Sequence, residues 1–187
     1  MAKIFLFRHG QTTYNLEHRF CGWTDADLTE SGIEEAKKIG KELKNEIVTR
    51  AYCSDQIRSK HTLVIVLGDR KNVPIIEDAR IKERDYGDLT GKNKDEVERE
   101  NPGQYKLWHR SYDTPPPNGE SIKDVEKRVV EFLNDLIPTI KKDDVILISA
   151  HGNSLRPIRK HFEGLSNEEM STFEHERGHI YCYNIKV

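Results

Sequence analysis

Two histidines, each followed directly by a glycine, come just after two short apolar runs of the chain. His9 follows the run 4–7, and His151 follows the run 145–148. A short continuous apolar run is typical of a strand that is covered on both faces. If both strands lie in one parallel sheet, the two histidines reach the same edge, which is where ligands of such sheets bind.

The chemistry that suits this pair is phosphoryl transfer through a covalent phosphohistidine. Histidine acts as a nucleophile, and its ordinary pKa of about 6.5 leaves a neutral ring at cytosolic pH. A second histidine, charged or donating a hydrogen bond, stabilises the oxygens of the transferring group. Arg8, directly before His9, adds a cation for the same anion. The plainer interpretation, that each histidine only ends a strand, suits a lone histidine better than a pair.

A metal centre is the other chemistry that two histidines support. Such a site needs a third ligand and an open position, and the sequence shows no H-x-H, H-E-x-x-H or D-x-H cluster. Arg8 also disfavours a dication beside His9. We therefore expect no metal.

The rest of the chain predicts the elements that position these histidines. Apolar residues recur at helical spacing from Thr29, a plausible N-cap, to Lys44. The polar stretch 77–118 holds only two weak helical patches and ends in a proline-rich connection. The remaining patterns predict strands at 51–53, 73–76 and 180–187, and helices at 56–67, from about 121, and at 154–162. This alternation indicates an α/β domain with a mostly parallel sheet, and we expect a single domain over residues 1–187.

Composition narrows the class of protein. The chain has 187 residues, 35% hydrophobic and 33% charged, which is typical of a soluble globular protein. A formal net charge of −2 gives no bias toward nucleic acid or an anionic membrane, so neither is expected as a partner. No apolar run approaches the roughly 20 residues that cross a bilayer. Export is not expected from the start of the chain, and three cysteines in no metal-ligand spacing favour a cytoplasmic location.

Five ordered blocks of the sequence resemble the histidine phosphatase superfamily, and most closely its cofactor-dependent phosphoglycerate mutases. The resemblance covers nearly the whole chain. Its blocks are Arg8-His9-Gly10-Gln11-Thr12 with Asn15; Phe20-Cys21-Gly22-Trp23; Ser54-Asp55-Gln56-Ile57-Arg58; Lys82-Glu83-Arg84-Asp85-Tyr86 through Lys94; and Trp108-His109-Arg110 with Gly119-Glu120-Ser121 and Ala150-His151-Gly152-Asn153. It implies a three-layer α/β/α phosphoglycerate mutase-like fold.

The resemblance also implies a reaction, in glycolysis and gluconeogenesis. 3-Phosphoglycerate and 2-phosphoglycerate interconvert through a phosphohistidine on His9, with 2,3-bisphosphoglycerate as primer and without metal. In that scheme Arg8, Arg58 and His151 bind the phosphoryl group, and Glu83 moves the proton of the substrate hydroxyl. The other positions that the resemblance marks as substrate-binding are Thr12, Asn15, Cys21, Gly22, Arg84, Tyr86, Lys94, His109, Arg110, Gly152 and Asn153.

Three departures from the mutase pattern bear on this expectation. His109 stands where the family usually has arginine, and it would offer a weaker, pH-dependent charge. Cys21 stands where threonine is usual. The chain ends at Val187, without the C-terminal tail and the insertion of longer mutases, so we expect more leakage of phosphate to water and a monomer or small homo-oligomer.

Two rival functions remain open. One is a phosphatase on the same fold that hydrolyses a small phosphate ester, although Lys94 and the block around His109 argue for a second anion clamp. The other is a non-catalytic module that binds a phosphorylated ligand. The sequence leaves the preferred phosphorylated acid and any regulation undetermined.

Overall fold

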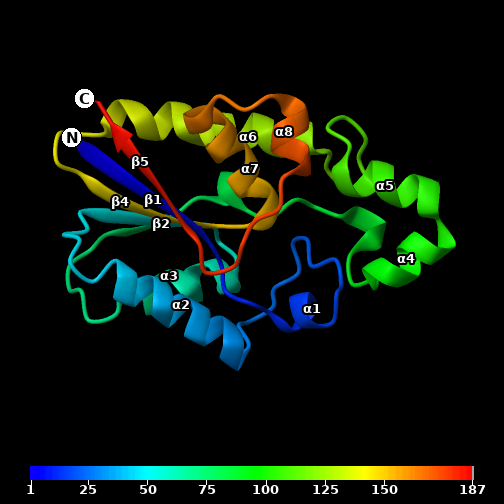
Figure 1. Ribbon diagram of the computed structural model, residues 1–187, viewed down its shortest axis with the longest axis horizontal. Helices are drawn as coiled ribbons and strands as arrows, with labels where there is room; N and C mark the ends of the chain where they lie inside the picture. The colour runs from blue at the N-terminus through cyan, green and yellow to red at the C-terminus, as the bar shows by residue number, and fades with distance from the viewer. Residues whose placement is uncertain (187) are drawn as a thin grey trace.

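Five strands form one sheet through the centre of the molecule in a computed structural model that describes residues 1–186. The sheet order is β3-β2-β4-β1-β5 (Figure 1). The strands are β1 (Ala2–Arg8), β2 (Arg50–Cys53), β3 (Ile75–Glu77), β4 (Val145–Ala150) and β5 (Ile180–Ile185). The first four run parallel and β5 pairs antiparallel with β1 at one edge, which confirms the predicted α/β class.

The two strands that precede the histidines are neighbours. β1 and β4 pair in parallel with Arg8 opposite Ala150, and the backbone N–H of His9 donates to the carbonyl of Ala150 over 3.0 Å. His9 and His151 therefore leave the same edge of the sheet side by side, as the sequence predicted.

Helices cover both faces of the sheet, which gives three layers (Figure 1). α2 (Glu30–Glu42) and α3 (Ile57–Leu67) pack on one face around Phe5, Phe7 and Leu147. α6 (Ile122–Leu136) and α7 (Gly152–Glu163) pack on the other, around a core that includes Ile4, Ile146 and Phe132. Alternate residues of β1 point to opposite faces, so both faces of this strand must be apolar.

Shorter elements gather beyond the carboxyl ends of the parallel strands. These are α1 (Thr13–Leu16), α4 (Lys94–Glu100), α5 (Pro102–Arg110) and α8 (Asn167–Thr172), with 3₁₀ turns at Ala79–Ile81 and Gly87–Leu89. A third 3₁₀ turn, Ile137–Thr139, follows α6 at the opposite, amino end of the strands. α4 and α5 enclose a small apolar cluster of their own, built on Phe20, Tyr86 and Tyr105. This cluster gives the polar stretch 77–118 enough buried surface to hold a fixed position beside the sheet edge.

Helix ends agree with the predicted caps in most places. The Thr29 side chain accepts from Gly32 N–H at the start of α2, and Gly68 ends α3. β3 begins two residues later than predicted, and α7 begins at Gly152 instead of residue 154. α1 and α8 were not predicted; at four and six residues they are too short to show helical periodicity. Over residues 1–186, every helix is too short or too polar to span a membrane.

Candidate active site

The ring of His9 is held in the tautomer that a nucleophile requires. Nδ1 lies 2.7 Å from the carbonyl oxygen of Gly10, which can only accept, so Nδ1 carries the proton. Nε2 therefore keeps its lone pair. The loop that holds this ring packs closely on α2, because a Cβ on Gly32 would lie 2.2 Å from the carbonyl oxygen of Gln11. Only glycine allows so close a backbone approach here.

His151 faces His9 from the end of β4. The two ring centroids are 5.0 Å apart and the planes are tilted by 56°. Nε2 of His151 lies 2.7 Å from Oγ of Ser54, which also accepts from the backbone N–H of Gln56 over 3.2 Å. Nδ1 is buried with no hydrogen-bond partner among the described residues. The pair thus presents ring nitrogens to a small buried space.

Positive charge surrounds both rings. Burial first, and then the guanidinium groups of Arg58 and Arg8, hold the pKa of His9 well below its ordinary value. Burial and Arg58 likewise lower the pKa of His151. Both rings are therefore neutral at physiological pH, and the surrounding potential favours an anion over a cation. In the ligand-free site His151 therefore acts by hydrogen bonding, and the negative charge of a bound phosphate would raise its pKa.

Glu83 presents its carboxylate to the same space. Oε1 accepts from the backbone N–H groups of Arg84 and Asn153 over 2.8 and 3.1 Å, and from Asn153 Nδ2 over 3.0 Å. Burial raises the pKa of this carboxyl, but the Arg84 N–H and the charges of Arg8 and Arg58 outweigh it and leave the pKa below its ordinary value. A carboxyl that acts as an acid needs a raised pKa, whereas this geometry supplies an ionised base. Nearby phosphate charge would raise the pKa.

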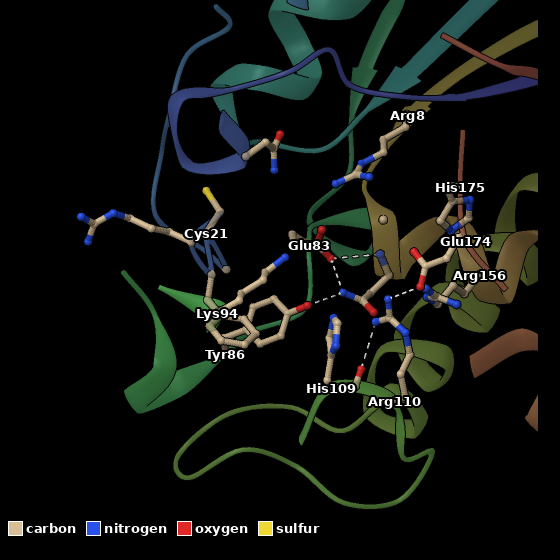
Figure 2. Close-up of a pocket in the computed structure, with 16 residues that line it drawn as sticks. Arg8, Cys21, Glu83, Tyr86, Lys94, His109, Arg110, Arg156, Glu174 and His175 are labelled. Carbon is tan, nitrogen blue, oxygen red and sulfur yellow. Dashed lines mark hydrogen bonds and ion pairs between the residues drawn. The ribbon is translucent and has the colours of Figure 1, made fainter. Parts of the chain in front are cut away.

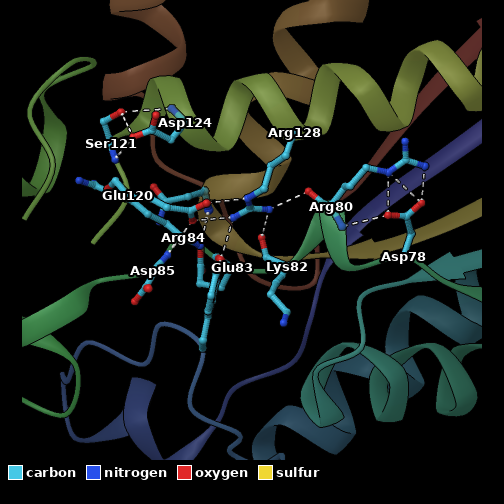
Figure 3. Close-up of polar contacts among 12 residues, drawn as sticks. Asp78, Arg80, Lys82, Glu83, Arg84, Asp85, Glu120, Ser121, Asp124 and Arg128 are labelled. Carbon is cyan, nitrogen blue, oxygen red and sulfur yellow. Dashed lines mark hydrogen bonds and ion pairs between the residues drawn. The ribbon is translucent and has the colours of Figure 1, made fainter. Parts of the chain in front are cut away.

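The backbone of Glu83 is fixed by a side chain from α6 (Figure 3). Nη2 of Arg128 donates to the carbonyl of Glu83 over 2.9 Å, and Nη1 donates to the carbonyls of Arg80 and Lys82 over 2.7 and 2.9 Å. The same guanidinium donates from Nε and Nη2 to the two carboxylate oxygens of Glu120, 2.9 Å each. Arg128 was not predicted as a site residue, because nothing in its local sequence connects it with Glu83.

A second support joins Glu83 to the Cys21–Trp23 turn. Gln56 accepts from the backbone N–H of Glu83 over 2.9 Å and donates to the carbonyl of Gly22 over 3.0 Å. Arg58 donates to that same carbonyl over 2.8 Å and to Thr24 O over 2.9 Å. Gly22 has a φ of +54°, a backbone conformation that favours glycine. The sequence motif marked this turn as substrate-binding, but the Gly22 carbonyl accepts hydrogen bonds from Gln56 and Arg58.

A cavity of about 100 Å³ opens onto this group (Figure 2). Of the residues predicted from the sequence, its lining includes Arg8, Asn15, Cys21, Gly22, Glu83, Tyr86, Lys94, His109, Arg110, Gly152 and Asn153. Five further lining residues were not predicted as site residues: Arg19, Phe20, Arg156, Glu174 and His175. Arg156 follows the Ala150-His151-Gly152-Asn153 block by three residues, and this proximity is the one sequence signal for it.

Five predicted residues are buried outside the cavity lining. His9 and His151 lie next to it, since one ring nitrogen of each and a carboxylate oxygen of the lining residue Glu83 all lie within 4.8 Å of one another. Arg58 is buried against the carbonyl of Gly22. Thr12 caps α1 and exchanges hydrogen bonds with Asn15. Arg84 is fully buried, and its Nε donates to Glu120 O over 2.6 Å.

The outer wall of the cavity is cationic, but His109 adds no charge to it. Burial and the neighbouring charges of Arg110 and Lys94 lower the pKa of His109 to about 3. Its charge therefore does not change between pH 5 and 8, contrary to the pH-dependent charge expected from the sequence. Lys94 and Arg110 carry the charge, with Arg156, whose pKa burial lowers only to about 10.

The donors of this site suit a phosphorylated acid better than a metal ion. Arg8, Lys94, Arg110 and Arg156 line the cavity and can bind oxygen anions. Sequence spacing showed no third metal ligand beside the two histidines, yet the fold brings Glu83 to that place. The arginines that lower both histidine pKa values nevertheless oppose a dication there.

Comparison with known proteins agrees with this geometry. Residues 4–186 match the family model of the histidine phosphatase superfamily (branch 1). The chain is 42% identical to a 2,3-bisphosphoglycerate-dependent phosphoglycerate mutase of Nitrobacter winogradskyi and to another of Bradyrhizobium diazoefficiens. Each match covers 98% of this chain and 92% of the relative.

Two solved structures are similar over nearly the whole fold. Bacillus stearothermophilus YhfR has a TM-score of 0.90 at 28% identity and covers 100% of this chain and 92% of its own. The α-ribazole phosphatase of Shigella flexneri has a TM-score of 0.86 at 26% identity, with 98% and 91% covered. With its paired histidines at one sheet edge, this chain belongs to the histidine phosphatase superfamily, branch 1.

Proposed function

We propose that this protein is a 2,3-bisphosphoglycerate-dependent phosphoglycerate mutase that interconverts 3-phosphoglycerate and 2-phosphoglycerate. The observation that carries the proposal is a cavity lined by an ionised carboxylate and an outer set of cations, with a neutral histidine nucleophile within 4.8 Å of that carboxylate. A phosphatase needs the first two, whereas an enzyme for phosphorylated acids also needs the third. Relatives at 42% identity carry the mutase name.

His9 attacks the phosphorus through Nε2, whose lone pair the Gly10 contact leaves free. Arg8, Arg58 and His151 bind the equatorial oxygens and stabilise the charge that spreads over them in the transition state. The Glu83 carboxylate accepts the proton of the substrate hydroxyl when that oxygen takes the phosphoryl group from His9, and returns a proton in the reverse direction. Microscopic reversibility makes one carboxyl both base and acid.

The other lining residues hold the rest of the substrate. Asn15, Gly152 and Asn153 complete the cradle of the transferred phosphate, with Thr12 as the cap that orients Asn15. Lys94 and Arg110 bind the carboxylate or second phosphate together with Cys21, Gly22, Tyr86 and the neutral ring of His109. Arg84, buried behind Tyr86, supports this wall by its charge. 2,3-Bisphosphoglycerate, when bound, supplies the phosphoryl group that loads His9, and the lining cations Arg8, Lys94 and Arg110 suit its two phosphates.

Metal independence and a cytoplasmic location belong to the same proposal. The arginine-rich surroundings that favour phosphate disfavour a divalent ion at His9. All three cysteines are free thiols, which suits a reducing compartment. A monomer or small homo-oligomer remains the expected state.

The experiment is turnover of 3-phosphoglycerate with chelator present, with and without catalytic 2,3-bisphosphoglycerate, following 2-phosphoglycerate and free phosphate separately. The proposal expects primer-dependent 2-phosphoglycerate with little free phosphate. Acid-labile phosphate should form on the wild type and be absent in His9→Ala. Label that persists in His9→Ala would refute the nucleophile, and free phosphate without isomerisation would refute the mutase.

A phosphatase for small phosphate esters is the second candidate. The structural similarity to the α-ribazole phosphatase of Shigella flexneri favours it. So does the ion pair between Arg110 and Glu174, which occupies one of the outer cations.

A further inference from the structure

The segment between α8 and β5 brings an unexpected carboxylate to the cavity. Glu174 and His175 lie on this segment, and both line the cavity. Oε1 of Glu174 forms an ion pair with Nη2 of Arg110, at the end of α5 (Figure 2). The side chain of Glu174 is 74% exposed and that of Arg110 is 27% exposed. The pair therefore lies at the mouth of the cavity, where an entering ligand meets it.

Glu174 acts on more than one cation of the outer wall. Burial lowers the pKa of Lys94 and of Arg156, the other two cations of that wall, and the negative charge of Glu174 raises both. A carboxylate among Lys94, Arg110 and Arg156 occupies the place that the distal anion of a phosphorylated acid would take. His109 contributes no compensating charge, because its pKa is lowered to about 3.

We propose that Glu174 is a specificity-determining residue, whose carboxylate competes with the distal anionic group of the substrate for Arg110. This proposal rests on the proposed function, because it concerns the same cavity. A ligand with a second anion must displace Glu174 from Arg110, whereas a phosphate monoester with a neutral distal group leaves the ion pair intact. Glu174 thus weakens the preference for phosphorylated acids and makes simple phosphate monoesters better competitors.

The size of the effect follows from the exposure of the pair. A solvent-exposed ion pair contributes little stability, and the free energy needed to displace it is correspondingly small. We expect about a fivefold effect on ligand affinity at low salt, the upper end of that range. Screening should reduce the effect as ionic strength rises toward molar salt, where charges interact over only about 3 Å.

The test uses two ligands that differ only at the distal group. 3-Phosphoglycerate has a carboxylate, and glycerol 3-phosphate has a neutral hydroxymethyl in its place. Dissociation constants are measured by calorimetry for the wild type, Glu174→Gln and a control variant, Glu176→Gln. Glu176 is exposed, lies two residues away and is outside the cavity lining.

Glu174→Gln should bind 3-phosphoglycerate about fivefold more tightly and leave glycerol 3-phosphate within twofold of the wild type, and Glu176→Gln should change neither. Adding Arg110→Met to Glu174→Gln should remove the gain. Equal changes for both ligands, or no change for 3-phosphoglycerate, would overturn the proposal. Binding is measured without turnover, so this test is independent of the mutase assignment. If 3-phosphoglycerate binds more tightly to Glu174→Gln but is not isomerised by the wild type, only the mutase assignment is refuted.

Discussion

Removing the guanidinium of Arg128 tests whether Glu83 is positioned from α6. Arg128→Met keeps the aliphatic stem but deletes the donors to three backbone carbonyls and both carboxylate oxygens of Glu120. The side chains of Arg128 and Glu120 are only 16% and 19% exposed. Little water can therefore reach the Glu120 carboxylate once its partner is removed. Breaking a buried pair in this way costs about 3–5 kcal/mol. We expect the low end, because Glu120 still accepts from Asp85 N–H.

The catalytic effect should exceed what a general loss of stability explains. Glu83 loses one of the two side-chain donors to its carbonyl, while Trp23 Nε1 keeps the other over 2.8 Å. Misplacement by about 1 Å costs on the order of 10²-fold in rate. We therefore expect kcat for phosphoglycerate to fall about 10²-fold in Arg128→Met, with KM nearly unchanged because the outer cations are intact. Arg128→Lys, which restores one donor, should recover part of the loss.

A pH profile separates positioning from unfolding. The Arg84 N–H helps to hold the pKa of Glu83 below its ordinary value, so a displaced Glu83 should have a higher pKa. The acidic limb of kcat/KM should then move to higher pH in Arg128→Met.

The control is Arg80→Met, which removes partly exposed ion pairs to Asp78 and to Asp135 of α6. It should change stability by no more than about 1 kcal/mol and leave kcat within twofold. Circular dichroism verifies that Arg128→Met is folded. If the folded variant has the wild-type kcat and its acidic limb is not shifted, the reasoning is refuted.

Three further predictions concern the histidines and the backbone around them. Four histidines have lowered pKa values: His9 and His151, which are buried, and His109 and His175, which are half-buried. The unfolded chain then binds more protons below pH 6.5, so stability falls as pH falls. Between pH 7.5 and 5.5 each should cost about 1.4 kcal/mol in the free energy of unfolding, measured by urea titration, and an unchanged midpoint would contradict this. Gly32→Ala places a Cβ 2.2 Å from the carbonyl of Gln11; we expect a loss of about 1–3 kcal/mol and slower phosphorylation of His9, and a wild-type melting temperature would exclude this clash. Ser54→Ala removes the 2.7 Å contact to His151; quenched-flow measurement of phosphoenzyme formation should show about a tenfold loss, equivalent to about 1.4 kcal/mol, and an unchanged rate would mean that Ser54 does not orient the ring.

Several features were predictable from the sequence because neighbouring residues determine them. Apolar runs indicated β1 and β4, helical periodicity and Thr29 indicated α2, and the two His-Gly pairs placed the nucleophile at the carboxyl edge of the sheet. Motif resemblance identified Glu83, whose own surroundings of Lys82 and Arg84 resemble an ordinary charged surface. That both histidines reach one edge followed from the general rule that parallel strands bring their carboxyl ends together, whereas the pairing of β1 with β4 is known only from the structure.

Only the tertiary structure decided the electrostatics of the site. The ionised state of Glu83 and the neutral state of His109 depend on burial and on charges from segments far away in the sequence. Arg128 and Glu174 likewise act across gaps of 45 and 64 residues, on Glu83 and Arg110. Periodicity, caps and turns report on residues within a few positions, whereas a pKa or an ion pair depends on distances that exist only after the chain has folded.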